Sequence, residues 1–177
     1  IMEDRSLSVY SIPLKHRIPT CGFLFAEKPK EAHLIKDMAD FYQIPVKELP
    51  AIKRGADYVT SEGTIVPNSR LTRPALPPKK YAYCSDTAYN ESILPIIEGV
   101  DLLYHEATFA DCDIARAKET FHSTARQAAE IAKKAQVKRL IIGHYSARYE
   151  ELSMIKNEAE SVFSNTILGN EGMTLSI

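Results

Sequence analysis

Residues 81–87 read YAYCSDT, an apolar run that predicts a strand and is followed at once by Asp86. Two later stretches repeat this layout, since one predicted strand ends on Glu106 and another ends on His144. In open α/β sheets, ligands and catalytic groups collect beyond the carboxyl ends of the strands. We therefore expect these three side chains to meet at one edge of a sheet.

Strands and helices alternate along the chain after Pro78. The expected strands are 81–85, 101–105 and 139–143, and the expected helices are 91–98, 125–135 and 150–163. Upstream we expect strands at 6–12 and 22–26, a helix at 31–42 and a hairpin around Glu62-Gly63, and downstream short strands at 167–168 and 173–177. Alternation of this kind predicts an α/β layered domain.

The stretch 44–78 differs in kind, because prolines punctuate it and it is basic in places. It reads as an excursion from the main fold, or as a long arm with little core of its own.

The composition is that of an ordinary globular domain. The chain has 177 residues, 45% of them apolar, and a net charge of −1, which by itself favours no nucleic-acid partner. No window has the roughly 18 apolar residues of a membrane span. Three widely spaced cysteines predict neither a disulfide framework nor a cysteine–zinc site, so a reducing cytoplasm is expected.

Two further histidines complete the candidate site. His16 follows the first predicted strand, and together with Asp86, Glu106 and His144 it offers N and O ligands suited to Zn²⁺ or Mn²⁺. Each residue alone has a plainer reading, as a turn former, a buried histidine or an exposed loop residue, and their shared position favours a site.

His122 stands immediately before a predicted helix start, where Thr124 and Gln127 can form a capping box. This places the imidazole at a rigid point and makes it a candidate proton donor. His33 and His105 are interpreted as surface and strand-packing residues.

Four ordered strings carry a resemblance to a known family: YCSDT at 83–87, HEATF at 105–109, FHSTARQAA at 121–129 and GHYSARY at 143–149. They resemble the C-terminal signature of the ribonuclease Z family, tRNA 3′-processing endonucleases of the metallo-β-lactamase superfamily. The segment PLKHRIPTCGFLF at 13–25 resembles that family's earlier histidine motif, so the resemblance covers nearly the whole chain.

The resemblance implies an αββα sandwich of the α/β class that holds two zinc ions, with residues 1–177 as the C-terminal part of one domain. It implies that His16 and His144 each bind one zinc, that Asp86 bridges both, that His122 protonates the leaving oxygen and that Glu106 orients His122. The implied substrate is precursor tRNA, cut after the discriminator nucleotide, and the implied assembly is a cytoplasmic homodimer. The plausible phosphate contacts beside a zinc ligand are Arg148, Ser146 and Tyr145.

Residues 28–56 match the place of the family's flexible tRNA-binding arm. Lys47, Lys53 and Arg54 would then contact phosphates, which positions RNA without reading its sequence. The Gly-Pro pair common in such arms is absent from IPVKELPAIKRG, the comparable stretch.

The superfamily's H-x-H-x-D-H motif is absent from these 177 residues. By family layout it belongs before Ile1, which predicts a fragment of a longer enzyme that is inactive in isolation. Three ligands are too few for a stable pair of ions, and half a sandwich would leave an apolar sheet face that drives oligomerisation or aggregation.

Two other functions remain open. One is a phosphodiesterase or sulfatase-like hydrolase that acts on a small molecule. The other is a non-catalytic module that kept the fold and lost the metal site.

Overall fold

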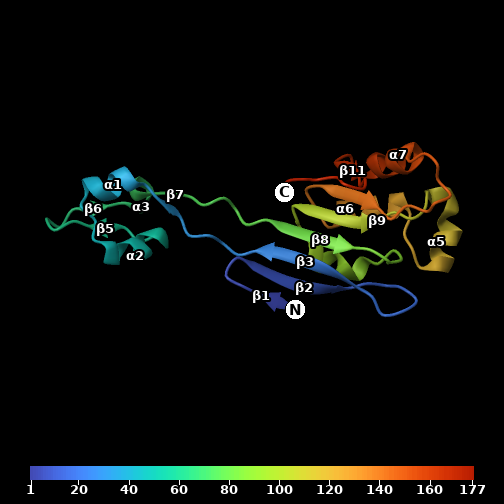
Figure 1. Cartoon of the computed structure of the whole chain (residues 1–177), viewed down its shortest axis with the longest axis horizontal. Coiled ribbons are helices and arrows are strands. Elements are labelled where there is room, and N and C mark those ends of the chain that lie inside the picture. The colour runs from blue at the N-terminus through green and yellow to red at the C-terminus, as the bar shows by residue number, and fades with distance from the viewer. The chain divides into compact units, whose positions relative to one another are not determined.

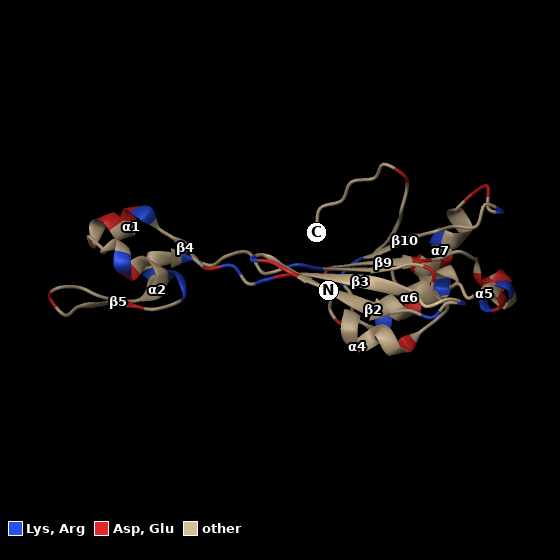
Figure 2. Ribbon diagram, turned by 60° about the horizontal axis from the view of Figure 1, so that its bottom comes forward, with Lys and Arg blue, Asp and Glu red and all other residues tan.

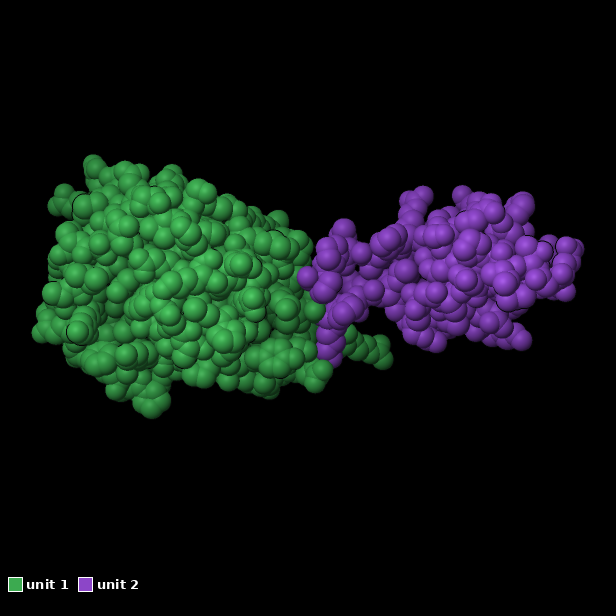
Figure 3. All heavy atoms as spheres, turned by 180° about the vertical axis from the view of Figure 1, so that it is seen from behind, with its two compact units in different colours: residues 1–27, 79–177 green, residues 28–78 purple.

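The computed structural model describes all of residues 1–177, which divide into two compact units (Figure 3). The main unit consists of residues 1–27 and 79–177, and the inserted unit consists of residues 28–78.

A seven-stranded mixed sheet forms the centre of the main unit (Figure 1). Its spatial order is β1 (Met2–Glu3), β2 (Leu7–Pro13), β3 (Cys21–Glu27), β8 (Lys80–Cys84), β9 (Leu102–Glu106), β10 (Leu140–Gly143) and β11 (Thr166–Leu168). The pairs from β1 to β8 are antiparallel, and those from β8 to β11 are parallel. The predicted α/β class is confirmed, and the parallel strands all end at the same edge.

Helices cover one face of this sheet. They are η2 (Glu91–Ile93), α4 (Leu94–Ile97), α6 (Ala125–Lys134) and α7 (Ser153–Val162), which all contribute to the core cluster. The helices η3 (Asp111–Asp113) and α5 (Ile114–Thr120) belong to the segment between β9 and α6, and α5 lies beyond the carboxyl ends of the strands (Figure 1). The small buried residues of α6, among them Ala128 and Ala132, join one core cluster with Leu103, Leu140 and Ile155. Short side chains let α6 lie close to the sheet.

The opposite face carries a row of aromatic side chains, here called the aromatic face. Tyr83 stacks on Tyr104 with ring centroids 4.7 Å apart, and Phe25 stacks on Tyr81 at 5.8 Å. Tyr83 is exposed, and the other three are half-buried. The C-terminal Ile177 lies with Phe25 and Tyr81 along a pocket of about 270 Å³.

The inserted unit is built from short elements around a small core. In chain order they are β4 (His33–Leu34), α1 (Lys36–Phe41), η1 (Val46–Glu48), α2 (Leu49–Lys53), β5 (Tyr58–Val59), β6 (Ile65–Val66), α3 (Asn68–Leu71) and β7 (Thr72–Arg73). Its buried cluster consists of Ala39, Ile44, Ile52, Val66 and Leu71. The stretch 44–78 thus lies in an excursion from the main fold that has a small core of its own. The predicted arm, residues 28–56, lies within this unit, which runs to Pro78.

Three local predictions differ from the structure. The helix expected over 31–42 begins only at Lys36, because His33 and Leu34 pair with Thr72 and Arg73 as a two-stranded ladder. The strand expected at 173–177 does not form, and helix α5 was not predicted. The hairpin around Gly63 is confirmed, since β5 pairs with β6 and Gly63 N–H donates to Thr60 O.

Charged residues of both signs occur together on the helices, as Figure 2 shows for α5, where Arg116 pairs with Glu119 at 2.9 Å. None of the helices combines the length and the apolar content that crossing a membrane requires.

Candidate active site

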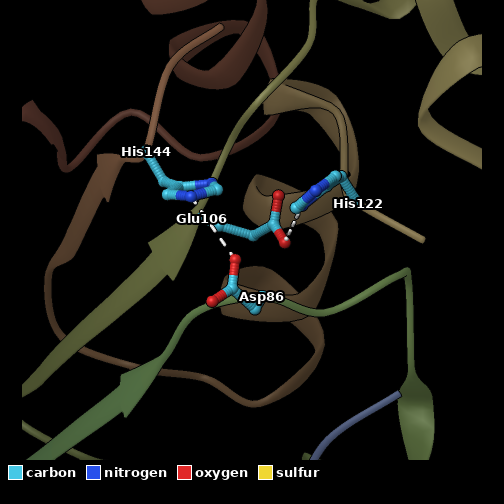
Figure 4. A group of neighbouring side chains, drawn as sticks. All are labelled: Asp86, Glu106, His122 and His144. Atoms are coloured by element: carbon cyan, nitrogen blue, oxygen red, sulfur yellow. Dashed lines mark hydrogen bonds and ion pairs between the residues drawn. The ribbon is translucent and has the colours of Figure 1, made fainter. Parts of the chain in front are cut away.

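Four residues predicted from the sequence meet at the carboxyl edge of the parallel strands (Figure 4). Asp86 follows β8, Glu106 is the last residue of β9, His144 follows β10, and His122 lies between α5 and α6. Each offers one potential ligand atom, and these four atoms all lie within 4.8 Å of one another.

Glu106 forms the buried base of the cluster. Its Oε1 accepts a hydrogen bond from Thr87 N (2.6 Å) and contacts His122 Nδ1 (2.9 Å). Its Oε2 accepts from the Thr108 hydroxyl (2.5 Å) and from Ser123 N (3.1 Å). A fully buried carboxyl group with four hydrogen-bond partners is rigidly held, which suits an orienting group.

The Thr108 hydroxyl determines which nitrogen of His144 carries a proton. Because this hydroxyl donates to Glu106, it can only accept from His144 Nδ1, 2.9 Å away. We assign the Nδ1–H tautomer on that network, which leaves a lone pair on His144 Nε2. That nitrogen lies 3.4 Å from Asp86 Oδ1.

His16 lies beside the cluster. Its Nδ1 is 3.1 Å from Phe121 O, a group that can only accept, so His16 also carries its proton on Nδ1. Its ring centroid is 5.2 Å from that of His122. The lone pair of its Nε2 is therefore free, as in His144.

His122 is held on three sides. Its Nδ1 faces Glu106, and its ring lies near the rings of His16 and His144, the latter at 5.3 Å. The capping box predicted for α6 is present, with Thr124 Oγ1 accepting from Gln127 N and Gln127 Oε1 accepting from Thr124 N. The helix start thus fixes the position of His122, and Nε2 remains as its exchangeable nitrogen.

Backbone strain concentrates at this edge. Asp86, Phe121 and His144 have φ values of 57°, 62° and 61°, in the left-handed region that residues with a β-carbon seldom adopt. They are three of the five non-glycine residues with positive φ. Strained conformations of this kind cluster at functional sites, where the surrounding structure holds a side chain in a working orientation.

The donor set fits a divalent metal ion. Asp86 and His144 are partly exposed, and two histidines present Nε2 lone pairs while their Nδ1 groups are hydrogen-bonded elsewhere. Metal-bound histidines commonly have this arrangement, in which the second nitrogen donates to an oxygen that orients the ring. Glu106 is less suited to bind metal, because both of its oxygens are already engaged.

The predicted phosphate contacts beside His144 have different environments. Arg148 is exposed, lies 3.5 Å from Asp113, and its guanidinium lies 5.2 Å from the centre of the Phe109 ring. Ser146 is half-buried. The Tyr145 hydroxyl donates to Ile142 O and accepts from Gly169 N, and burial raises its pKa to about 12, so it acts structurally.

The predicted arm contacts all lie in the inserted unit. Lys47 belongs to η1, and Lys53 and Arg54 line an open pocket of about 380 Å³ with Glu31. Arg54 is 3.8 Å from Glu31, and both side chains are largely exposed.

Sequence reasoning missed the residues that orient the site. Thr108 lies within the string HEATF, two residues after Glu106, so its place at the strand end was visible. The roles of Thr87, Ser123 and the Phe121 carbonyl follow from loop conformations, for which the sequence carries no signal.

Comparisons with known proteins agree with this geometry. Residues 71–145 match the family model described as "Beta-lactamase superfamily domain". The whole chain is 75% identical to ribonuclease Z of Parabacteroides distasonis and 59% identical to ribonuclease Z of Bacteroides fragilis. The chain spans 58% of the length of each of these two relatives.

Solved structures support the fold. The match to the short form of human tRNase Z covers all of this chain and 44% of the human chain, with a TM-score of 0.60 and 23% sequence identity. The match to the metallo-β-lactamase fold protein YhfI of Bacillus subtilis covers 97% of this chain and 50% of the YhfI chain, with a TM-score of 0.61 and 17% sequence identity.

Proposed function

We propose, from the premise that this chain belongs to the ribonuclease Z family of the metallo-β-lactamase superfamily, that it contributes to a zinc-dependent endoribonuclease. The substrate would be precursor tRNA, from which the enzyme removes the 3′ trailer. The observation that carries the proposal is the convergence of Asp86, Glu106, His122 and His144 within 4.8 Å. The cytoplasm, where precursor tRNA is processed, is the proposed location, and a homodimer is the proposed assembly.

Asp86, His144 and His16 would hold the metal. A zinc ion held there would supply a nucleophile at neutral pH and would neutralise charge on the phosphoryl group. Asp86 and His144 follow β8 and β10, which flank β9 in the sheet, and Asp86 Oδ1 lies 3.4 Å from His144 Nε2, so they can present an oxygen and a nitrogen toward the same point. The hydrogen bonds from His16 to Phe121 O and from His144 to Thr108 keep both rings turned for this role.

His122 is the proposed proton donor. Hydrolysis adds a hydroxyl group to phosphorus and breaks its bond to the 3′-oxygen of the discriminator nucleotide. That oxygen leaves with a proton, so the tRNA ends in a 3′-hydroxyl and the trailer begins with a 5′-phosphate. Protonated His122 can supply the proton from Nε2 while Nδ1 remains bonded to Glu106.

Arg148, Ser146, Lys47, Lys53 and Arg54 are proposed to contact RNA phosphates. Such contacts come from exposed cations and hydroxyls, and they position a substrate without reading its sequence. Tyr145 is proposed to support the loop that carries Ser146 and Arg148 rather than to contact RNA, because its hydroxyl is hydrogen-bonded to the backbone.

Zinc content and cleavage together test the proposal. In a protein that joins this chain to a segment carrying the H-x-H-x-D-H motif, Asp86→Asn should lose zinc binding and cleavage. His122→Asn in the same protein should keep its zinc and lose cleavage by roughly 10²- to 10⁴-fold. The control is His33→Asn, at an exposed position in the inserted unit, which should change neither. Zinc would be measured by mass spectrometry, and cleavage by release of the trailer from a precursor tRNA.

Two outcomes would contradict this assignment. Loss of zinc from His122→Asn would make His122 a ligand rather than a proton donor. Hydrolysis of bis(p-nitrophenyl) phosphate without any cleavage of precursor tRNA would favour the small-molecule hydrolase.

A further inference from the structure

A second hollow lies directly beside the proposed proton donor. It has a volume of about 250 Å³, and His122 forms part of its wall. The other lining residues are Lys15, Ala88, Tyr89, Ile114, Lys118 and Gln127. Pockets for drug-sized ligands run from about 300 to 1,000 Å³, so this one suits a smaller planar group.

The charge of this pocket is positive. Lys15 and Lys118 are exposed, no acidic residue lines the pocket, and neither ammonium group has an ion-pair partner. Lys138 and Lys134, by contrast, are paired: Lys138 lies 2.7 Å from Asp101, and Lys134 lies 2.5 Å from Glu91. Two unpaired cations at one small pocket indicate an anionic ligand.

Tyr89 gives the pocket an aromatic wall that is held in place. Its hydroxyl donates to Glu91 (2.6 Å) and accepts from Lys134 (2.8 Å). The hydrogen bonds from Lys134 and Tyr89 lower the pKa of Glu91, so this network is charged and intact at neutral pH. The hydroxyl is occupied, the ring packs against the core, and Lys134 lies 5.5 Å from the ring centre, so the part of the ring that lines the pocket is what remains for a ligand.

We propose that this pocket binds the nucleotide on the 5′ side of the cleaved bond, with its base on Tyr89 and its 5′-phosphate between Lys15 and Lys118. The inference rests on the proposed endonuclease activity. An aromatic wall and a pair of cations match the two chemical halves of a nucleotide, and stacking accepts any base because every base has a π-face.

The position of His122 decides which nucleotide occupies the pocket. Its proton goes to the leaving 3′-oxygen, which belongs to the ribose upstream of the cut. We therefore assign the pocket beside His122 to the nucleotide that carries this 3′-oxygen. Tyr89 would position the substrate through its base, without any part in proton transfer.

Binding of a mononucleotide tests the pocket without requiring cleavage. Adenosine 5′-monophosphate carries the base, the 5′-phosphate and a free 3′-hydroxyl, like the end of the proposed product. We expect it to shift the NMR signals of Tyr89 and His122, and to bind more tightly than adenosine or inorganic phosphate alone. Tyr89→Leu should weaken this binding roughly tenfold, and Tyr89→Phe should keep it.

The lysines and the controls complete the design. Lys15→Gln with Lys118→Gln should abolish the preference for the monophosphate over adenosine. The matched controls are Tyr10→Leu and Lys133→Gln, at exposed positions outside the pocket, which should leave binding unchanged. Circular dichroism of each variant would show that the fold is retained.

Several results would overturn the proposal. They are unshifted Tyr89 and His122 signals, equal binding of inorganic phosphate and the monophosphate, and full affinity in a folded Tyr89→Leu variant. Failure of the proposed function is distinguishable, because precursor tRNA then stays intact even in a protein that also carries the H-x-H-x-D-H motif, while the mononucleotide still binds. Cleavage of precursor tRNA by Tyr89→Leu with an unchanged KM would sink the pocket assignment alone.

Discussion

Glu106 is a single buried residue on which four donors converge, and its charge matters for folding as well as for the site. Glu106→Gln replaces one acceptor oxygen with an NH₂ group that faces donors. We expect the free energy of unfolding to fall by roughly 1–3 kcal/mol, because buried N–H groups lose their acceptor. Urea denaturation would measure the loss.

The matched control is Glu98→Gln, at an exposed position near the end of α4, which should stay within about 0.5 kcal/mol of the wild type. Equal stabilities of Glu106→Gln and the wild type would contradict the view that Glu106 holds the site together.

His105 makes stability depend on pH. Burial lowers its pKa, its Nδ1 donates to Glu106 O, and its Nε2 has no partner in the core. Above pH 6.5 the imidazole of His105 is neutral in both the folded and the unfolded state. As the pH falls below 6.5 the unfolded state takes up a proton that the folded state resists, so stability decreases toward the lowered folded pKa.

The contribution of His105 can be isolated by substitution. We expect wild-type stability to drop by roughly 1 kcal/mol more than that of His105→Asn between pH 7.5 and pH 5.5. The control is Leu103→Ala, a buried change without a titratable group, which should lower stability by similar amounts at both pH values. Parallel pH profiles of His105→Asn and the wild type would refute this role.

At the scale of elements, the start of α6 couples a helix cap to the site. Thr124 caps the helix two residues after His122, and its hydroxyl also lies 3.3 Å from Asp111 Oδ1. Thr124→Ala should lower the free energy of unfolding by about 1 kcal/mol, as measured by thermal or urea denaturation. Ser153→Ala, at the start of α7 where no side-chain cap forms, should change it little.

Local patterns predicted the elements that depend on local contacts. Strands β8, β9 and β10 and the capped helix α6 agree with their predictions to within a residue or two. The prediction of a helix over 31–42 failed at His33 and Leu34, because these residues pair with Arg73 and Thr72, which lie about forty positions further along the chain. Helix α5 was missed because IARAKET has few apolar residues to mark a buried stripe.

The candidate site also has a part that the sequence pattern predicts and a part that depends on the conformation of loops. Asp86, Glu106 and His144 were predictable, because parallel strands bring their carboxyl ends together whatever the loops do. The tautomers of His16 and His144 were not predictable, since they depend on Phe121 O and Thr108 Oγ1, which loop conformation positions.

At the scale of the whole molecule, the aromatic face predicts self-association of the 177-residue chain. Half-exposed Phe25, Tyr81 and Tyr104 and exposed Tyr83 form one apolar surface, and surfaces of this kind are sites of association. We expect sedimentation velocity to detect dimers or larger species at micromolar concentrations, and Tyr83→Lys to reduce them.

Tyr10→Lys is the control, because Tyr10 is 52% exposed but points to the other face of the sheet. It should leave the sedimentation profile unchanged. A wild-type chain that remains monomeric throughout the concentration series would rule out association through the aromatic face.

The inserted unit occupies the position of a hairpin loop. It leaves the main unit after β3 and returns at β8, the antiparallel neighbour of β3, and Glu27 N–H donates to Lys79 O across the gap. A turn of a few residues could join the same two ends, and the entropy of closing a loop grows only slowly with its length. The insertion can therefore be shortened, lengthened or exchanged between homologues without changing the register of the sheet.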